Sequence, residues 1–136
     1  MKIIETQLTG TVTVEDVERW KAALEAEIAS LPDGEVFALL VNIHGYEPAS
    51  MEAHKAFRTV VPRTLARHGF RPGFADLLGT GIDVTTERGV TCVAHANVHH
   101  DAKKMADYEQ KIGRANERFF TRLEDARTWI RSSAFQ

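Results

Sequence analysis

The segment from Asn116 to Ile130 constrains the fold of this chain more than any other stretch. Its two adjacent phenylalanines predict a short apolar strand that runs directly into a helix. Thr121 and Glu124 have the spacing of a capping box, which satisfies free amides at a helix start. Apolar residues then recur at helical spacing, at Leu123, Ala126 and Ile130. A strand followed by a closing helix is typical of a small layered α/β domain.

The first half of the chain alternates between strand and helix patterns. Lys2 to Leu8 predicts a strand, and a second capping box at Thr13 and Asp16 starts an amphipathic helix. Val36 to Ile43 is apolar apart from Asn42. A short unbroken apolar run bounded by turn residues predicts a central buried strand.

The second half continues the alternation. A helix is expected from Ser50, with a kink or break at Pro62, because proline removes a backbone donor. Val90 to Val98 predicts a strand, and a helix follows from Asp101. The glycine-rich stretch between residues 69 and 89 is expected to contain a short helical turn or strand. The order predicts one domain over residues 1–136, an α/β fold with a mixed sheet of four to five strands and about four helices mainly on one face.

Composition narrows the class of protein. The chain has 136 residues and a formal net charge of −2, which gives no global attraction to nucleic acid or anionic membrane. A single cysteine, Cys92, excludes an internal disulfide and a cysteine-based zinc cage. No apolar run approaches the roughly 18 residues of a membrane span, and the N-terminus lacks a secretory pattern. We expect a soluble cytoplasmic protein that binds no nucleic acid and has no membrane span.

Two segments, together with the order of elements, resemble the STAS domain, and within it the anti-sigma-factor-antagonist-like group of stand-alone bacterial proteins. They are Val36 to Ser50 and Arg118 to Ile130. The resemblance implies a non-catalytic binding or regulatory module that acts through a protein partner or a small ligand. The contact surface would be the loop of His44, Gly45 and Tyr46. The broader fold also resembles Sec14-type lipid-transfer domains, which implies an alternative: a lipid or hydrophobic-ligand carrier.

The STAS resemblance also directs attention to Ser50. Antagonists of this kind carry Asp-x-Ser-Gly, followed by a serine at the next helix start that a partner kinase phosphorylates. Here Asn42, Ile43, His44 and Gly45 hold the first four places, so only Gly45 and Ser50 match. Ser50 is either a phospho-acceptor, stabilised by the helix dipole, or a plain N-cap.

A cluster of histidines gives a third hypothesis. His95, Asn97 and His99 would share one face of a strand. Imidazoles near a carboxylate are typical zinc ligands, so the candidate metal residues are His95, His99, His100 and Asp101, with His44 or His54 as further candidates. This hypothesis is a His-rich metal-dependent protein or enzyme. The alternative is that these histidines are solvated or lie in the core, and that Asp101 is an N-cap. We predict no cofactor, and we favour a protein that is not an enzyme.

Charge is uneven along the chain. Residues 53–75 contain basic side chains and no acidic one. This pattern indicates either a docking face for an acidic partner or anionic ligand, or a solvated helix face. The basic candidates are Lys55, Arg58, Arg63 and Arg67. We expect the partner to be a protein or a small apolar or anionic ligand, and we expect self-association into a homodimer. A carrier would need an apolar cavity lined by Phe57, Val61, Phe74, Leu77 and Leu78.

Overall fold

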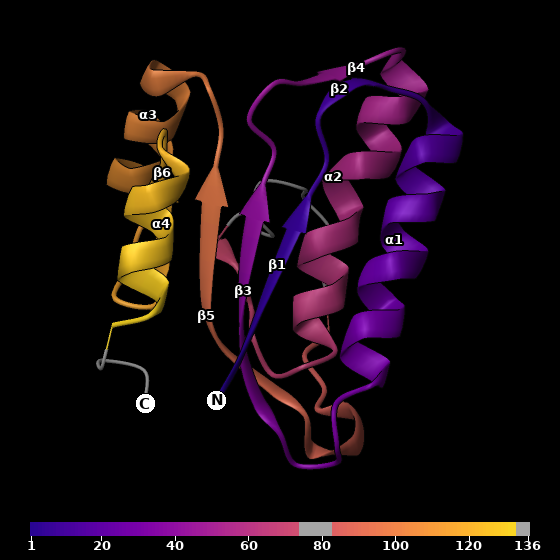
Figure 1. Ribbon diagram of the computed structural model, residues 1–136, viewed down its shortest axis with the longest axis vertical. Coiled ribbons are helices and arrows are strands. Elements are labelled where there is room, and N and C mark those ends of the chain that lie inside the picture. The colour runs from indigo at the N-terminus through magenta and orange to yellow at the C-terminus, as the bar shows by residue number, and fades with distance from the viewer. Residues whose placement is uncertain (74–82, 133–136) are drawn as a thin grey trace.

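The computed structural model describes residues 1–73 and 83–132, and its elements alternate between strand and helix (Figure 1). In chain order the elements are β1 (Lys2–Gln7), β2 (Gly10–Val12), α1 (Val14–Ala29), β3 (Val36–Asn42), β4 (Tyr46–Pro48), α2 (Met51–Ala66), a 3-10 turn (Glu87–Gly89), β5 (Thr91–Val98), α3 (Ala102–Ile112), β6 (Glu117–Phe120) and α4 (Leu123–Ile130).

The main sheet has four strands in the order β1-β3-β5-β6, and β2 pairs with β4 beside it. All of these pairs are parallel. A helix separates each strand of the main sheet from the next and returns the chain to the same end, which makes neighbouring strands parallel. The predicted α/β fold class is confirmed. The paired strands run parallel to one another, whereas a mixed sheet was expected.

Three helices lie on one face of the sheet and one on the other. Strand order follows chain order, so right-handed crossovers place α1, α2 and α3 on the same face. Side chains of α1 and α2 form one core cluster, and α3 lines a cavity on the same side. Helix α4 follows the last strand and contributes Ala126 and Ile130 to a second cluster on the opposite face. This arrangement agrees with the prediction that the helices lie mainly on one face.

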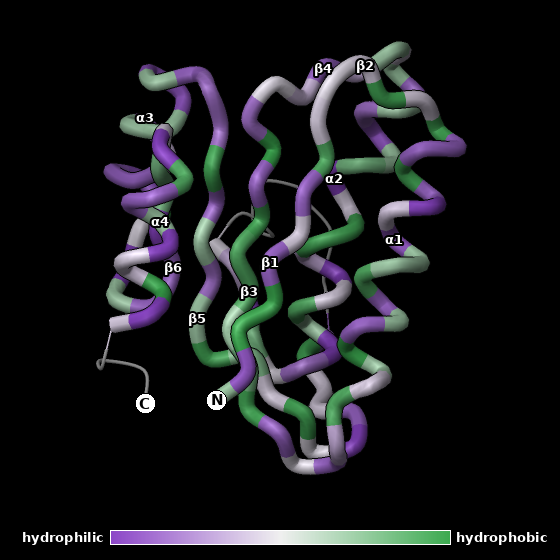
Figure 2. Tube along the Cα trace, viewed as in Figure 1, coloured by the Kyte–Doolittle hydropathy of each residue, from purple (hydrophilic) through white to green (hydrophobic). Residues whose placement is uncertain are grey.

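Strand β3 supplies both cores, as its apolar sequence predicted. Phe37, Leu39 and Val41 alternate into the cluster beneath α1 and α2. Ala38 and Leu40 point to the other face, beneath α4. The hydrophobic colour along β3 is visible in Figure 2. Burial on both faces fixes this strand at the centre of the molecule.

Strand β5 contains an irregularity that the sequence pattern did not reveal. Phe37 pairs with Cys92, but the next residue, Ala38, pairs with Ala94, so one residue of β5 is skipped. An extra residue reverses the alternation of side chains. Cys92 therefore packs in the first cluster, whereas Ala94 packs in the second. Regular alternation along the strand would have placed both on one face.

The start of α1 follows the sequence prediction. Thr13 Oγ1 accepts the amide proton of Asp16 at 3.2 Å, and Asp16 Oδ2 accepts that of Thr13 at 3.0 Å. The predicted capping box is therefore present. Helix α2 is a single helix with Pro62 inside it, and the expected short turn in the glycine-rich stretch is the 3-10 turn.

The start of α4 differs from the prediction. Arg122 is the N-cap and makes no side-chain cap bond, so the proposed capping box of Thr121 and Glu124 is wrong. Glu124 instead accepts a hydrogen bond from Arg127 at 2.9 Å. The same guanidinium binds both oxygens of Glu5 on β1, at 2.8 and 2.7 Å. This bidentate pair ties α4 to β1, and Glu124 stays in the first turn of the helix.

Candidate ligand-binding site

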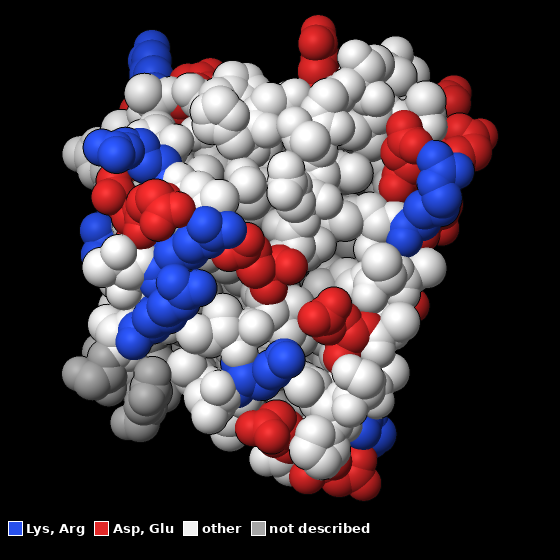
Figure 3. All heavy atoms as spheres, viewed as in Figure 1, with Lys and Arg blue, Asp and Glu red and all other residues white. Residues whose placement is uncertain are grey.

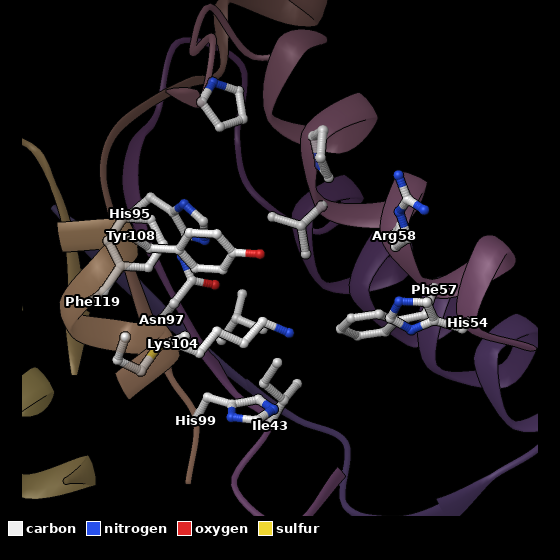
Figure 4. A pocket seen from close by; sticks show the side chains of 15 residues that line it. Ile43, His54, Phe57, Arg58, His95, Asn97, His99, Lys104, Tyr108 and Phe119 are labelled. Carbon is white, nitrogen blue, oxygen red and sulfur yellow. The ribbon is translucent and has the colours of Figure 1, made fainter. Parts of the chain in front are cut away.

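A cavity of about 310 Å³ lies between α2 and α3, over the sheet (Figure 4). Its apolar wall comes from α2, α3 and two strands, through Val41, Phe57, Val61, Pro62, Met105 and Phe119. Polar side chains are also present, among them His95, Asn97, His99, Lys104 and Arg58. An apolar cleft with a few polar groups is the usual form of a small-molecule site.

The cavity gathers part of the predicted histidine cluster. His95, Asn97 and His99 line it together, as the alternation along the strand predicted. His100 does not line it. Its ring stacks on that of His99 with centroids 4.1 Å apart, and its Nδ1 accepts the amide proton of Gly45 at 2.9 Å.

Asp101 also lies apart from the cavity lining, at the start of α3. Its Oδ1 accepts the amide proton of Lys104 at 3.0 Å, which makes it the N-cap. Among the residues that the structure describes, no three His, Cys, Asp or Glu side chains are arranged to hold a metal ion. The four candidate metal residues are thus divided between a cavity wall, a ring stack and a helix cap.

A buried carboxyl group, that of Glu117 on the neighbouring strand, contacts His95. Glu117 on β6 is 0% exposed and His95 is 2% exposed. His95 Nδ1 lies 3.2 Å from Glu117 Oε2. Sequence analysis missed Glu117, although its spacing from Phe119 places both side chains on the cavity side of β6.

The second oxygen of Glu117 has its own partners. Oε1 accepts the amide proton of Gly73 at 2.9 Å, and Nε of Arg114 lies 3.6 Å from it. Nε2 of His95 is buried, and no hydrogen-bond partner for it exists within residues 1–73 and 83–132. A buried polar atom without a partner is unusual in a folded protein.

The other histidines near the cavity favour their neutral forms. Burial lowers the pKa of His99 from 6.5 to about 4, and nearby His100 and Lys104 act in the same direction. His99 Nδ1 accepts the amide proton of Asp101 at 2.9 Å. Burial and the charge of Arg58 also lower the pKa of His54.

The loop of His44, Gly45 and Tyr46 contacts the cavity wall. The ring of Tyr46 stacks on that of Phe57, with centroids 4.4 Å apart. Its hydroxyl lies 3.5 Å from Nδ1 of His54, and burial raises the pKa of Tyr46. Gly45 has a φ of +84° and a Cβ there would lie 2.9 Å from Thr9 Oγ1, so this turn requires glycine.

Ser50 begins α2 directly after this loop. Its hydroxyl oxygen accepts the amide proton of Ala53 at 3.0 Å, so the side chain serves as the N-cap. The cap places the hydroxyl at the positive end of the helix dipole.

The four predicted basic residues lie along α2 and at its C-terminal end, in different surroundings. Arg58 lines the cavity, and Lys55 is exposed. Arg63 borders a separate groove between α1 and α2. In the same groove, a guanidinium nitrogen of Arg67 lies 3.6 Å from Oε1 of Glu25. On the side of the molecule seen in Figure 3, basic and acidic residues are interspersed.

Two further features are Cys92 and the predicted carrier cavity. Cys92 is buried, and burial raises its pKa to about 12, which makes the thiol unreactive. Phe57 and Val61 line the cavity as a carrier would require. The other three residues predicted for it, Phe74, Leu77 and Leu78, lie outside the described residues.

The chain matches a known protein family over most of its length. A family model described as SpoIIAA-like matches residues 3–131, nearly the whole chain. Curated proteins and solved structures give no match. None of the described helices is long and apolar enough to cross a membrane. The chain therefore belongs to the SpoIIAA-like family, and its fold is of the STAS type that its sequence resembles.

Proposed function

We propose that this protein is a STAS-type regulatory module whose cavity between α2, α3 and the sheet binds a small, largely apolar ligand. Family membership supports a regulatory module in general. The observation that carries the ligand is the cavity itself, together with a buried nitrogen of the lining residue His95 that has no hydrogen-bond partner among the described residues.

The composition of the cavity wall supports an apolar ligand body. Phe57, Val61 and Pro62 face it from α2, and Met105 and Phe119 from the opposite side. Transfer of apolar surface from water into such a wall is favourable by roughly 25 cal/mol per Å². A volume of about 310 Å³ suits a molecule of the size of a medium-chain lipid fragment or a substituted aromatic ring.

A pair of stacked rings connects the cavity wall to the loop of His44, Gly45 and Tyr46. Phe57 lines the cavity and stacks on Tyr46 of the exposed loop. A ligand that moves Phe57 therefore moves the loop of His44, Gly45 and Tyr46, where we place the contact with a protein partner. Ser50 follows this loop, so its phosphorylation would add negative charge beside the same contact surface.

Cavity filling tests the proposal. Val61→Phe places extra bulk in the cavity, whereas Val84→Phe adds the same bulk at a position that is 46% exposed and does not line it. We expect wild type and Val84→Phe to bind octan-1-ol saturably in calorimetry, and Val61→Phe to lose at least tenfold in affinity. Equal affinity of all three proteins, or no saturable binding to wild type, would contradict the ligand site.

Native mass spectrometry of protein purified from its own host gives a second measurement. It reports a retained ligand, phosphorylation of Ser50 and a homodimer in one spectrum. We expect a ligand mass on wild type that Val61→Phe lacks. A wild-type spectrum of ligand-free, unmodified monomer would remove support from the ligand, the phosphorylation and the dimer together.

A further inference from the structure

The pair formed by His95 and Glu117 determines which imidazole nitrogen carries the proton. Glu117 Oε1 accepts the amide proton of Gly73 at 2.9 Å and lies 3.6 Å from the guanidinium of Arg114. These partners suit an ionised carboxylate, which only accepts hydrogen bonds. Oε2 is 3.2 Å from Nδ1 of His95. Nδ1 therefore donates a hydrogen bond to Glu117, and the tautomer whose one proton is on Nδ1 has its lone pair on Nε2.

That lone pair is an unused acceptor at the cavity wall. Nε2 is buried and has no partner within the described residues, and His95 itself lines the cavity. The His95 side chain is among those that line the cavity (Figure 4), and Nε2 is the ring nitrogen farther from the backbone. The surroundings are apolar: the ring of Phe70 meets that of His95 edge-on at 6.2 Å. A ligand group that donates a hydrogen bond to Nε2 would give this nitrogen the partner that the described residues do not supply.

We propose that the ligand is an apolar molecule bearing a hydroxyl group, an alcohol or phenol, that donates a hydrogen bond to Nε2 of His95. This inference rests on the ligand site proposed above and names the chemistry of its polar end. A carboxylate is excluded from this position, because it brings only acceptors and would face the Nε2 lone pair with the Glu117 charge behind it. Binding moves no proton out of the pair.

Isomeric probes test this chemistry. Octan-1-ol and 1-methoxyheptane have the same atoms and nearly the same apolar surface, but only the alcohol has a proton to donate. A net hydrogen bond of ordinary strength predicts that wild type prefers the alcohol by about threefold to tenfold. Octanoate serves as the anionic probe and is expected to bind more weakly than the alcohol. Calorimetry on the full chain measures all three.

The variant Glu117→Gln distinguishes a role in ligand recognition from a purely structural role. The amide oxygen can still accept from Gly73, which turns the amide NH₂ toward Nδ1 of His95. Nδ1 then becomes an acceptor and the proton moves to Nε2. A donor at Nε2 serves the oxygen of either isomer, so the preference for the alcohol should fall to about one. His95→Leu should reverse it, because burial of an unpaired hydroxyl is unfavourable.

Val61→Ala is the matched control, because it removes only apolar contact from the cavity wall. It should weaken both isomers by the same factor. An unchanged preference for the alcohol in Glu117→Gln, equal affinity of wild type for both isomers, or tighter binding of octanoate would overturn the inference while leaving the ligand site intact. Absence of binding by any probe would overturn both.

Nuclear magnetic resonance gives a readout that needs no ligand and no variant. The ¹⁵N chemical shifts of an imidazole separate a protonated from an unprotonated nitrogen. We expect wild-type His95 to show protonated Nδ1 and unprotonated Nε2. A proton on Nε2 in the wild-type protein would overturn the inference even if Glu117→Gln fails to fold.

Discussion

His95 and Glu117 occupy paired positions on neighbouring parallel strands, and their side chains meet with Nδ1 3.2 Å from Oε2. Both side chains are almost fully removed from water. Among the described strands, β6 lies at the edge of the main sheet and pairs with β5. The buried contact therefore connects the edge strand to the rest of the sheet at the wall of the cavity.

The first prediction is that these two residues are strongly coupled in stability. His95→Leu or Glu117→Leu alone leaves a buried partner unsatisfied and should lower the free energy of unfolding by about 2–4 kcal/mol. The double variant should lose about 1–3 kcal/mol less than the sum of the two. Urea unfolding of the four proteins gives the coupling energy.

His68 provides the control for this cycle. It is also a buried histidine, but its Nδ1 lies 2.9 Å from the carbonyl oxygen of Val90, not from a carboxylate. His68→Leu combined with Glu117→Leu should be additive within about 0.5 kcal/mol. Equal coupling in both cycles would show that the effect is a general loss of packing.

The second prediction concerns pH. The pKa of His99 is lowered from 6.5 to about 4, so between these values the unfolded chain binds a proton that the folded protein does not. Stability is then fully present above about pH 6.5 and falls as the pH drops toward 4, with a slope of at most about 1.4 kcal/mol per pH unit from this residue. Urea unfolding between pH 7 and 4.5 should show the fall.

His99→Gln isolates the contribution of His99 to that slope. Glutamine keeps a polar side chain that does not titrate, so the variant should lose stability less steeply over the same range. The lowered pKa of His54 acts in the same direction and leaves a smaller residual slope. Identical slopes for wild type and His99→Gln would assign the pH dependence elsewhere.

The third prediction separates the structural role of Ser50 from any signalling role. Ser50→Ala removes the hydrogen bond to the amide of Ala53 and should reduce the unfolding free energy by about 1 kcal/mol. Ser50→Asp and Ser50→Asn keep a capping oxygen and should unfold near wild type. If Ser50→Ala is as stable as wild type, the cap is not worth its usual amount here.

The fourth prediction concerns the thiol. Burial raises the pKa of Cys92 to about 12, so the native protein should not react with a disulfide reagent such as 5,5′-dithiobis(2-nitrobenzoate) at pH 8. The reaction should proceed at once in denaturing urea. Rapid modification of the folded protein would place the thiol near the surface.

Much of the fold was predictable from local pattern. The unbroken apolar run of β3 predicted a central strand, and Thr13 with Asp16 predicted the start of α1, because both signals depend on neighbours in the chain. Alternation along β5 also predicted that His95, Asn97 and His99 share one side, where the cavity lies. The prediction of the α4 cap failed because the helix begins at Leu123 with Arg122 as its N-cap, one residue later than a box of Thr121 and Glu124 requires.

The sequence by itself determined the order of elements, the family and the side of β5 on which the candidate residues lie. These follow from side-chain periodicity and capping, which act over a few residues. Only the tertiary structure decided that Glu117 meets His95, that His100 contacts Gly45 and does not line the cavity, and that a skipped residue places Cys92 in the other core. Strand register places Glu117 beside His95 and Cys92 in the other core, and it is fixed by the packing of the whole sheet.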